Sequence, residues 1–133
     1  RDDAIIFTTD THYDDYLETS EGQKLPVSHC IVGTSGHEII PELNVELSTM
    51  EKIYPKSTFG YRWNICHWMR CYDVEIIGVC TDICVVTNAL VLKTYYPEVE
   101  ITVDASCCAG STPEKHKAAL EVMKSCQINV IGE

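Results

Sequence analysis

The sequence predicts an α/β protein with a three-layer α/β/α architecture and a mostly parallel sheet. Several short runs are apolar throughout, which is typical of strands covered on both faces. In the second half these runs alternate with helical patterns, as expected for parallel strands joined by crossover helices. Acids, thiols and imidazoles follow the runs, at the strand ends where parallel sheets collect their sites. The length of 133 residues fits one domain over residues 1–133.

The first half contains two predicted strands separated by polar segments. One strand is expected over residues 4–8, directly before the polar residues 9–12. Residues 13–24 are acidic and are expected to form a surface loop, and a short helix can form near residues 37–42. The segment EKIYPKSTFG indicates a second short strand followed by a loop. The segment YRWNICHWMRC has the apolar spacing of a helix.

The second half is more regular. DVEIIGVC has the pattern of an apolar strand, and Asp82 is expected to cap a helix over residues 83–95. EVEITVDA predicts the next strand. Ser111 or Thr112 is then the expected cap of an amphipathic helix, and INVIG predicts the last strand. The residues expected on the inner face of that amphipathic helix are Ala118, Ala119, Val122 and Met123.

Composition excludes several classes of partner. A formal net charge of −10 repels phosphate backbones, so we expect no nucleic-acid partner. No apolar run is long enough to cross a bilayer, so we expect no membrane partner. The chain has eight cysteines, several of them in or beside apolar periodic segments. This placement predicts free thiols in a reducing, cytoplasmic location rather than a secreted disulfide framework.

Cys84 is the candidate nucleophile. In the first turn of a helix over residues 83–95 it would feel the positive end of the helix dipole, which favours the thiolate and lowers the pKa of the thiol. The alternative is a cysteine that only fills space in the helix, as we expect for Cys80. Lys56 is a candidate cation for stabilising a thiolate and a later oxyanion, the alternative being an ordinary surface lysine.

A second group of residues has the composition of a metal site. Asp10 and His12 are two apart at a strand end, so their side chains point the same way, and His29 follows later. One carboxylate and two imidazoles form a common divalent-metal set with open positions. The alternative is three unrelated loop residues. A structural zinc site drawing on Cys66, His67 and Cys71 is a further, weaker option, because no C-x-x-C pair exists in the chain.

Three motifs in order resemble the isochorismatase-like cysteine hydrolases, most closely their nicotinamidase-type members. They are TDTHYDDYLETSEGQKLPVSHCIVGTSGHEI, EKIYPKSTFG and GVCTDICVVTNAL. The third is the most specific, and it departs from the family pattern only where Thr87-Asn88 replaces the final T-A. VDASCCAGSTPEKHKAALEVMKSC resembles the strand and helix that follow. The resemblance covers nearly the whole chain from Ala4 onward and implies a Rossmann-like strand order.

The resemblance also implies roles for single residues. Cys84 would be the nucleophile and Lys56 its partner. The backbone N–H groups of Cys80 and Cys84 would form the oxyanion hole, next to a cis peptide bond between Val79 and Cys80. Phe59 would line the substrate pocket. The implied metal ligands are Asp10, His12 and His29.

The implied activity is hydrolysis of a small amide, with nicotinamide as the first candidate, through a covalent acyl-enzyme. The implied cofactor is a divalent metal ion that orients the substrate, zinc first, with iron or manganese as alternatives. Family members usually form dimers or tetramers, so a homo-oligomer is expected. Two other functions stay open: another isochorismatase-like or carbamoyl-amide hydrolase, and a catalytically inactive binding or scaffold protein.

One part of the family pattern is missing. The family carries a catalytic aspartate at the end of its first strand, which is the central strand of the sheet, and no matching segment occurs in this sequence. A parallel sheet without its central strand leaves two unpaired edges. One strand with its crossover helix needs at least roughly 25 residues. We therefore expect the natural protein to contain such a segment upstream of Arg1 or as a separate piece.

Overall fold

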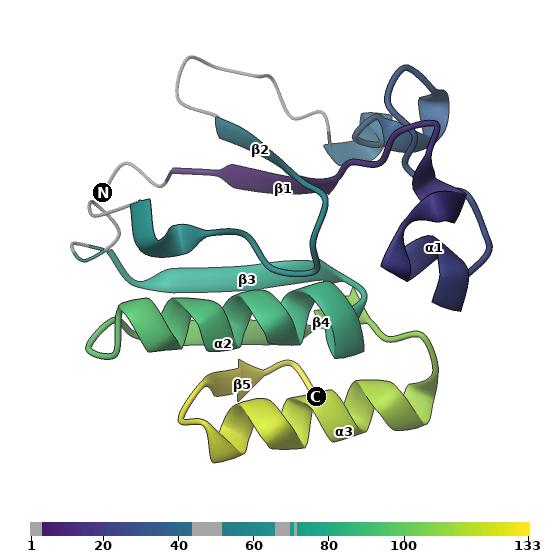
Figure 1. Cartoon of the computed structure of the whole chain (residues 1–133). Helices are drawn as coiled ribbons and strands as arrows, with labels where there is room; N and C mark the ends of the chain where they lie inside the picture. The colour runs from purple at the N-terminus through teal and green to yellow at the C-terminus, as the bar shows by residue number, and fades with distance from the viewer. Residues whose placement is uncertain (1–3, 44–51, 66–69, 71) are drawn as a thin grey trace. The chain divides into compact units, whose positions relative to one another are not determined.

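The computed structural model describes residues 4–43, 52–65, 70 and 72–133. The chain divides into two compact units, Arg1–Thr58 and Phe59–Glu133. Both units contain parallel strands, and the second also contains the long helices (Figure 1). The predicted mixed α/β class with parallel sheets is confirmed.

In the first unit, β1 (Ile6–Asp10) pairs with β2 (Lys52–Lys56) in parallel. The register places Asp10 beside Lys56, so the carboxyl ends of the two strands coincide. Strand β1 lies two residues further along the chain than the predicted strand at residues 4–8. Asp10 is therefore the last residue of the strand itself, where the pairing fixes its backbone.

Residues 13–24 do not form the surface loop that their polarity predicts. A 3-10 turn covers Tyr16–Glu18, and α1 spans Ser20–Lys24 with Thr19 as its N-cap. Tyr16 is only 1% exposed. The prediction was wrong because one buried aromatic residue anchors the segment, and a single apolar position gives no periodic signal.

Other short segments of the chain are turns. In place of a helix near residues 37–42, 3-10 turns cover Ser35–His37 and Pro41–Leu43. In the second unit, the described part of the segment predicted as a helix contains a 3-10 turn at Trp63–Ile65, and residues 66–69 and 71 of that segment lie outside the described residues. The alternative zinc ligands Cys66, His67 and Cys71 lie outside the described residues.

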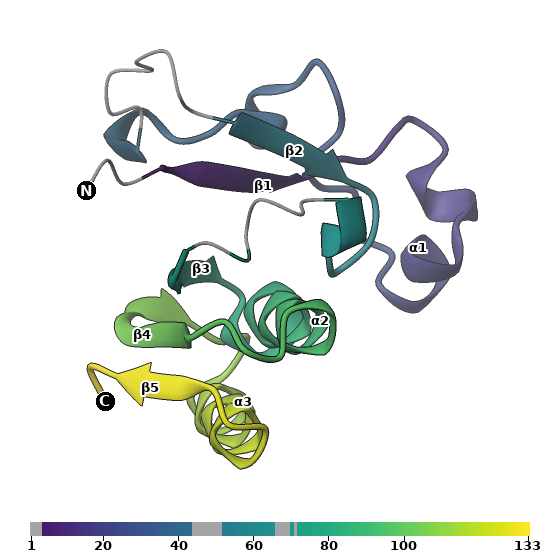
Figure 2. The ribbon, with the colours of Figure 1, turned by 90° about the vertical axis from the view of Figure 1, so that its left-hand side faces the viewer.

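The second unit has a parallel sheet in the order β3-β4-β5. Its strands are β3 (Val74–Val79), β4 (Ile101–Ala109) and β5 (Asn129–Ile131). Helices α2 (Val86–Tyr95) and α3 (Pro113–Ser125) both cover one face of this sheet (Figure 2). The strand-helix-strand-helix-strand order agrees with the prediction for the second half.

The core of this unit lies between β4 and the two helices. Ile101 and Val103 from β4 are 1% and 0% exposed. The helices contribute five more buried apolar side chains: Ala89, Leu92, Ala119, Leu120 and Met123. Burying each large aliphatic side chain contributes about 1.5–3 kcal/mol relative to leaving it in water. These contacts fix α2, and with it the turn that precedes it.

Helix α3 begins as predicted and is rotated from its predicted face. The side chain of Thr112 accepts a hydrogen bond from the backbone N–H of Lys115 at 3.2 Å, and Pro113 opens the helix. Ala119 and Met123 are buried, whereas Ala118 and Val122 are exposed. Leu120 is buried in their place, so the buried face of α3 is rotated by part of a turn from the predicted face.

Strand β3 is less covered than a continuous apolar run predicts. Ile77 is 54% and Val79 is 68% exposed. Among the described strands, β3 pairs only with β4. No helix in the described part of the chain is long and apolar enough to cross a membrane.

Candidate active site

Cys84 lies in a turn between β3 and α2. After Val79 the chain passes through a cis peptide bond to Cys80, as the resemblance implies, and residues Thr81–Val85 form one π-helical turn. The carbonyl of Cys80 accepts hydrogen bonds from the N–H groups of Ile83 and Val85, both at 3.1 Å. Cys84 is half-buried. The residue is therefore not part of the fully buried core.

Two polar contacts hold this turn, one to α3 itself and one to the connection between β4 and α3. The hydroxyl of Thr81, which is 0% exposed, lies 2.8 Å from Nδ1 of His116. The carboxylate of Asp82 accepts hydrogen bonds from the backbone N–H and the hydroxyl of Ser111, at 2.7 and 2.6 Å. The hydroxyl bond is the main reason that the pKa of Asp82 lies below its usual value. Contacts with α3 and with Ser111 just before it therefore hold the turn in place.

Asp82 is not the helix cap that the sequence predicts. The N-cap of the π-helical turn is Cys80, and no side chain caps it. The carboxylate of Asp82 instead binds Ser111, which is 29 residues away. An aspartate before a helix has the same local sequence pattern whether it caps that helix or binds a distant residue. Only the tertiary contact with Ser111 distinguishes the two roles.

In the first unit, Lys56 and Asp10 form an ion pair at the carboxyl ends of β1 and β2. The side chain of Lys56 is 3% exposed, and that of Asp10 is 29% exposed. Lys56 is therefore not an ordinary surface lysine. Removing a lysine from water is costly unless a carboxylate compensates, and Asp10 supplies that charge.

Asp10, His12 and His29 come together beside this ion pair. Their candidate ligand atoms all lie within 4.8 Å of one another. His12 is 7% exposed, and its Nε2 has no hydrogen-bond partner among the described residues. Nδ1 of His29 lies 2.8 Å from the carbonyl oxygen of Val27. Because a carbonyl only accepts, Nδ1 carries the hydrogen, and Nε2 of a neutral His29 keeps its lone pair.

Glu21 was missed by the sequence analysis. Its Oε1 lies 3.8 Å from Nε2 of both His12 and His29. The residue sits on the five-residue helix α1, where the side chain of Thr19 accepts a hydrogen bond from Gly22 N at 3.0 Å. A Thr cap before an acid was the available signal, but it predicts a helix start and not a ligand.

Tyr16 packs against both imidazoles. Its ring centroid lies 4.8 Å from that of His12 and 5.0 Å from that of His29, in edge-to-face geometry. Its hydroxyl donates to the carbonyl of Leu25 at 2.9 Å. Burial, followed by the charges of Glu21 and Asp10, raises the pKa of the tyrosine hydroxyl. Tyr16 therefore holds the rings as a neutral side chain.

These residues fit a divalent metal ion. A buried imidazole nitrogen without a partner is costly, and a metal ion would satisfy it. A second imidazole fixed through a backbone carbonyl, one carboxylate and a nearby glutamate complete a set typical of zinc, iron or manganese. Asp10, His12 and His29 would be the ligands.

Cys30 lies near the charges of Asp10, Lys56 and Glu21, and it is a poor nucleophile. Burial, followed by the negative charge of Asp10, raises the pKa of its thiol. Burial also raises the pKa of the Cys108 thiol. Both thiols therefore stay protonated at neutral pH more than an exposed cysteine would.

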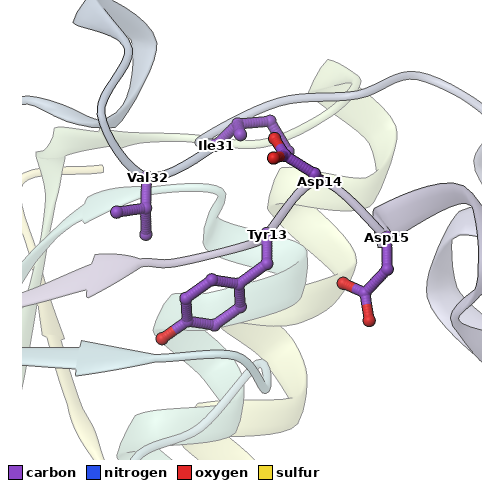
Figure 3. A pocket seen from close by; sticks show the side chains of 5 residues that line it. All are labelled: Tyr13, Asp14, Asp15, Ile31 and Val32. Carbon is purple, nitrogen blue, oxygen red and sulfur yellow. The ribbon is translucent and has the colours of Figure 1, made fainter.

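A shallow hollow of about 480 Å³ lies on the first unit, next in sequence to His12 and Cys30. Figure 3 shows the side chains around it, which are Tyr13, Asp14, Asp15, Ile31 and Val32. None of these five residues is a predicted site residue. Phe59, the predicted pocket residue, belongs to the second unit and is 47% exposed. Cys80 and Cys84 also belong to the second unit, whereas Lys56 and the three candidate metal ligands belong to the first.

Known structures and families share this fold. The chain is similar to a nicotinamidase/pyrazinamidase from Bacillus subtilis, with 24% identity and a TM-score of 0.82 over 97% of this chain and 75% of that one. A pyrazinamidase of Pyrococcus horikoshii in complex with zinc is 25% identical, with a TM-score of 0.80 over 98% and 75% of the two chains. A pyrazinamidase/nicotinamidase from Streptococcus mutans is 27% identical, with a TM-score of 0.80 over 97% and 76%.

A search of curated proteins gave no match. The family model of the isochorismatase domain matches residues 1–132, which is almost the full length of the sequence. The chain therefore belongs to the isochorismatase family.

Proposed function

We propose that this protein is a cysteine hydrolase that cleaves the C–N bond of a small amide, with nicotinamide as the first candidate substrate. The observation that carries the proposal is the position of Cys84, half-buried in the turn between a parallel strand and a helix. Such a position exposes a thiol to a substrate and to the positive end of the helix dipole. The similarity to nicotinamidases and pyrazinamidases supports the substrate class.

In the proposed reaction, the thiolate of Cys84 attacks the amide carbonyl carbon. The N–H groups of Cys80 and Cys84 stabilise the oxyanion that forms. The C–N bond then breaks, and ammonia leaves after its nitrogen gains a proton. Water attacks the thioester, which releases the carboxylic acid and returns the thiol.

Lys56 is the proposed cationic partner of the thiolate. Its burial and its pairing with Asp10 keep one ammonium group in a fixed place. A fixed ammonium stabilises both the thiolate and the later oxyanion, whereas a mobile surface lysine would not. Phe59 is the proposed aromatic contact for the substrate ring.

Asp10, His12 and His29 would hold a divalent metal ion, with the carboxylate of Glu21 close to both imidazoles. When bound, the ion would offer an open coordination position to a ring nitrogen of the substrate and so orient it. Zinc is the first candidate, with iron or manganese as alternatives.

The test is ammonia release from a panel of small amides by the full-length protein. We expect turnover of a pyridine amide by the wild type and none by Cys84→Ala. The matched control is Cys126→Ala, because Cys126 is an exposed cysteine at the end of α3. Equal turnover by Cys84→Ala and the wild type would contradict the cysteine mechanism.

The same panel separates the other two functions. Turnover of carbamoyl amides but not of pyridine amides would assign the related hydrolase activity. No turnover of any amide, together with nicotinamide that fails to slow iodoacetamide labelling of Cys84, would indicate a catalytically inactive binding or scaffold protein.

A further inference from the structure

Asn88 has a buried side-chain amide within α2, and it makes four hydrogen bonds. It is 6% exposed. Its Oδ1 accepts from the backbone N–H of Tyr61 at 2.9 Å and from Nε1–H of Trp63 at 2.8 Å. Its Nδ2 donates to the carbonyl of Cys84 at 2.8 Å and to the carbonyl of Phe59 at 3.3 Å. The amide therefore uses both acceptor and both donor positions.

The partners fix the orientation of this amide. The Tyr61 and Trp63 groups can only donate, and the two carbonyls can only accept. Turning the amide over would place two donors against donors and one acceptor against two carbonyl oxygens. The side chain thus has a single satisfied orientation, and all four bonds depend on it.

The segment on the far side of the amide, residues 59–63, lies directly on α2. A Cβ atom at Gly60 would lie 2.8 Å from Cγ2 of Thr87, so the backbone approaches the helix too closely for a side chain. Trp63 is 4% exposed, and its carbonyl accepts a hydrogen bond from the Tyr96 hydroxyl at 2.5 Å. These contacts hold residues 59–63 against α2, so the backbone of Phe59 is fixed relative to Asn88.

We infer that Asn88 is a positioning residue that sets the substrate-contacting Phe59 and the nucleophilic Cys84 at a fixed separation. The inference rests on the proposed function, which assigns those two roles. An alanine can make none of the four bonds, so this link depends on the side chain that this chain carries.

The test compares Asn88→Ala with the wild type in the full-length protein. Small displacements of a nucleophile or an oxyanion donor cost about tenfold to a hundredfold in rate. We therefore expect kcat/KM for amide hydrolysis to fall at least about tenfold and the alkylation of Cys84 by iodoacetamide to slow severalfold. The matched control is Asn64→Ala, an exposed asparagine close in sequence, which should change neither value.

Two further variants separate positioning from general stability. Asn88→Asp keeps an acceptor for Tyr61 and Trp63 and loses both donors, so kcat and the labelling rate should fall while the indole N–H resonance of Trp63 stays in place. Trp63→Phe removes one bond on the Phe59 side, so KM should rise while kcat changes less than twofold. These variants also serve if Asn88→Ala does not fold.

The inference is overturned if folded Asn88→Ala or Asn88→Asp keeps kcat, KM and the Cys84 labelling rate within twofold of the wild type. A wild type that turns over no amide would instead overturn the proposed function. The labelling rate reports the position of Cys84 without any substrate, so it decides the inference in that case too.

Discussion

Replacing His12 by leucine should change the free energy of unfolding little without a metal ion and lower it when a metal ion is bound. The Nε2 atom of His12 is buried and has no hydrogen-bond partner among the described residues. Leaving such a group unsatisfied costs about 1–3 kcal/mol. Leucine removes that cost but also removes ring contacts with Tyr16 and His29, at centroid distances of 4.8 and 4.9 Å, worth about 0.5–1.5 kcal/mol each. In EDTA the two terms nearly cancel, so the variant should lie within about 1 kcal/mol of the wild type.

With zinc the balance changes. A ligand present at one hundred times its Kd stabilises the folded state by about 2.7 kcal/mol, and only the wild type keeps both imidazoles. Urea unfolding with EDTA and with zinc measures both free energies. The control is His37→Leu, because His37 lies in the same unit outside the cluster. A wild type that gains nothing from zinc, iron or manganese, together with a variant that is several kcal/mol less stable in EDTA, would refute the reasoning.

Two other predictions concern Ser111 and Lys56. Ser111→Ala should lower the free energy of unfolding by about 0.5–1 kcal/mol at pH 7. The hydroxyl of Ser111 lowers the pKa of Asp82 below 3.8, so the loss of stability in the variant should shrink as the pH falls below that value. Acid unfolding curves of the wild type and the variant measure this change. A loss that stays constant with pH would contradict the prediction. Lys56→Met leaves the partly exposed Asp10 without its cation. The variant should release no ammonia, and its free energy of unfolding in urea should fall by about 1–3 kcal/mol. The control is Lys117→Met on the exposed surface of α3, which should change neither value.

The strands and long helices could be predicted because their signals are local. Continuous apolar runs predicted β3 and β4, and Thr112 with Pro113 marked the start of α3. The surroundings of the candidate site could not be predicted in the same way. Glu21 reaches the imidazoles from a five-residue helix that is too short for a periodic pattern.

Long-range polar contacts were equally hidden in the sequence. Asp82 has the local pattern of a cap, and only the fold brings Ser111 to its carboxylate. Asn88 appeared as a departure from a motif, and its four partners come from segments up to 29 residues away. The residue types that carry chemistry were recognisable, whereas the residues that hold them in place became visible only through tertiary contacts.

The most direct measurement is the pH dependence of Cys84 alkylation by iodoacetamide, followed by mass spectrometry with and without nicotinamide. If Cys84 is a nucleophile, its labelling rate should rise with a midpoint below about 7.5, whereas an ordinary thiol titrates near 8.5. Saturating nicotinamide should slow that labelling and leave the exposed Cys126 unchanged. A midpoint at or above the ordinary value, with labelling that nicotinamide does not slow, would contradict the assignment of Cys84 as the reacting thiol.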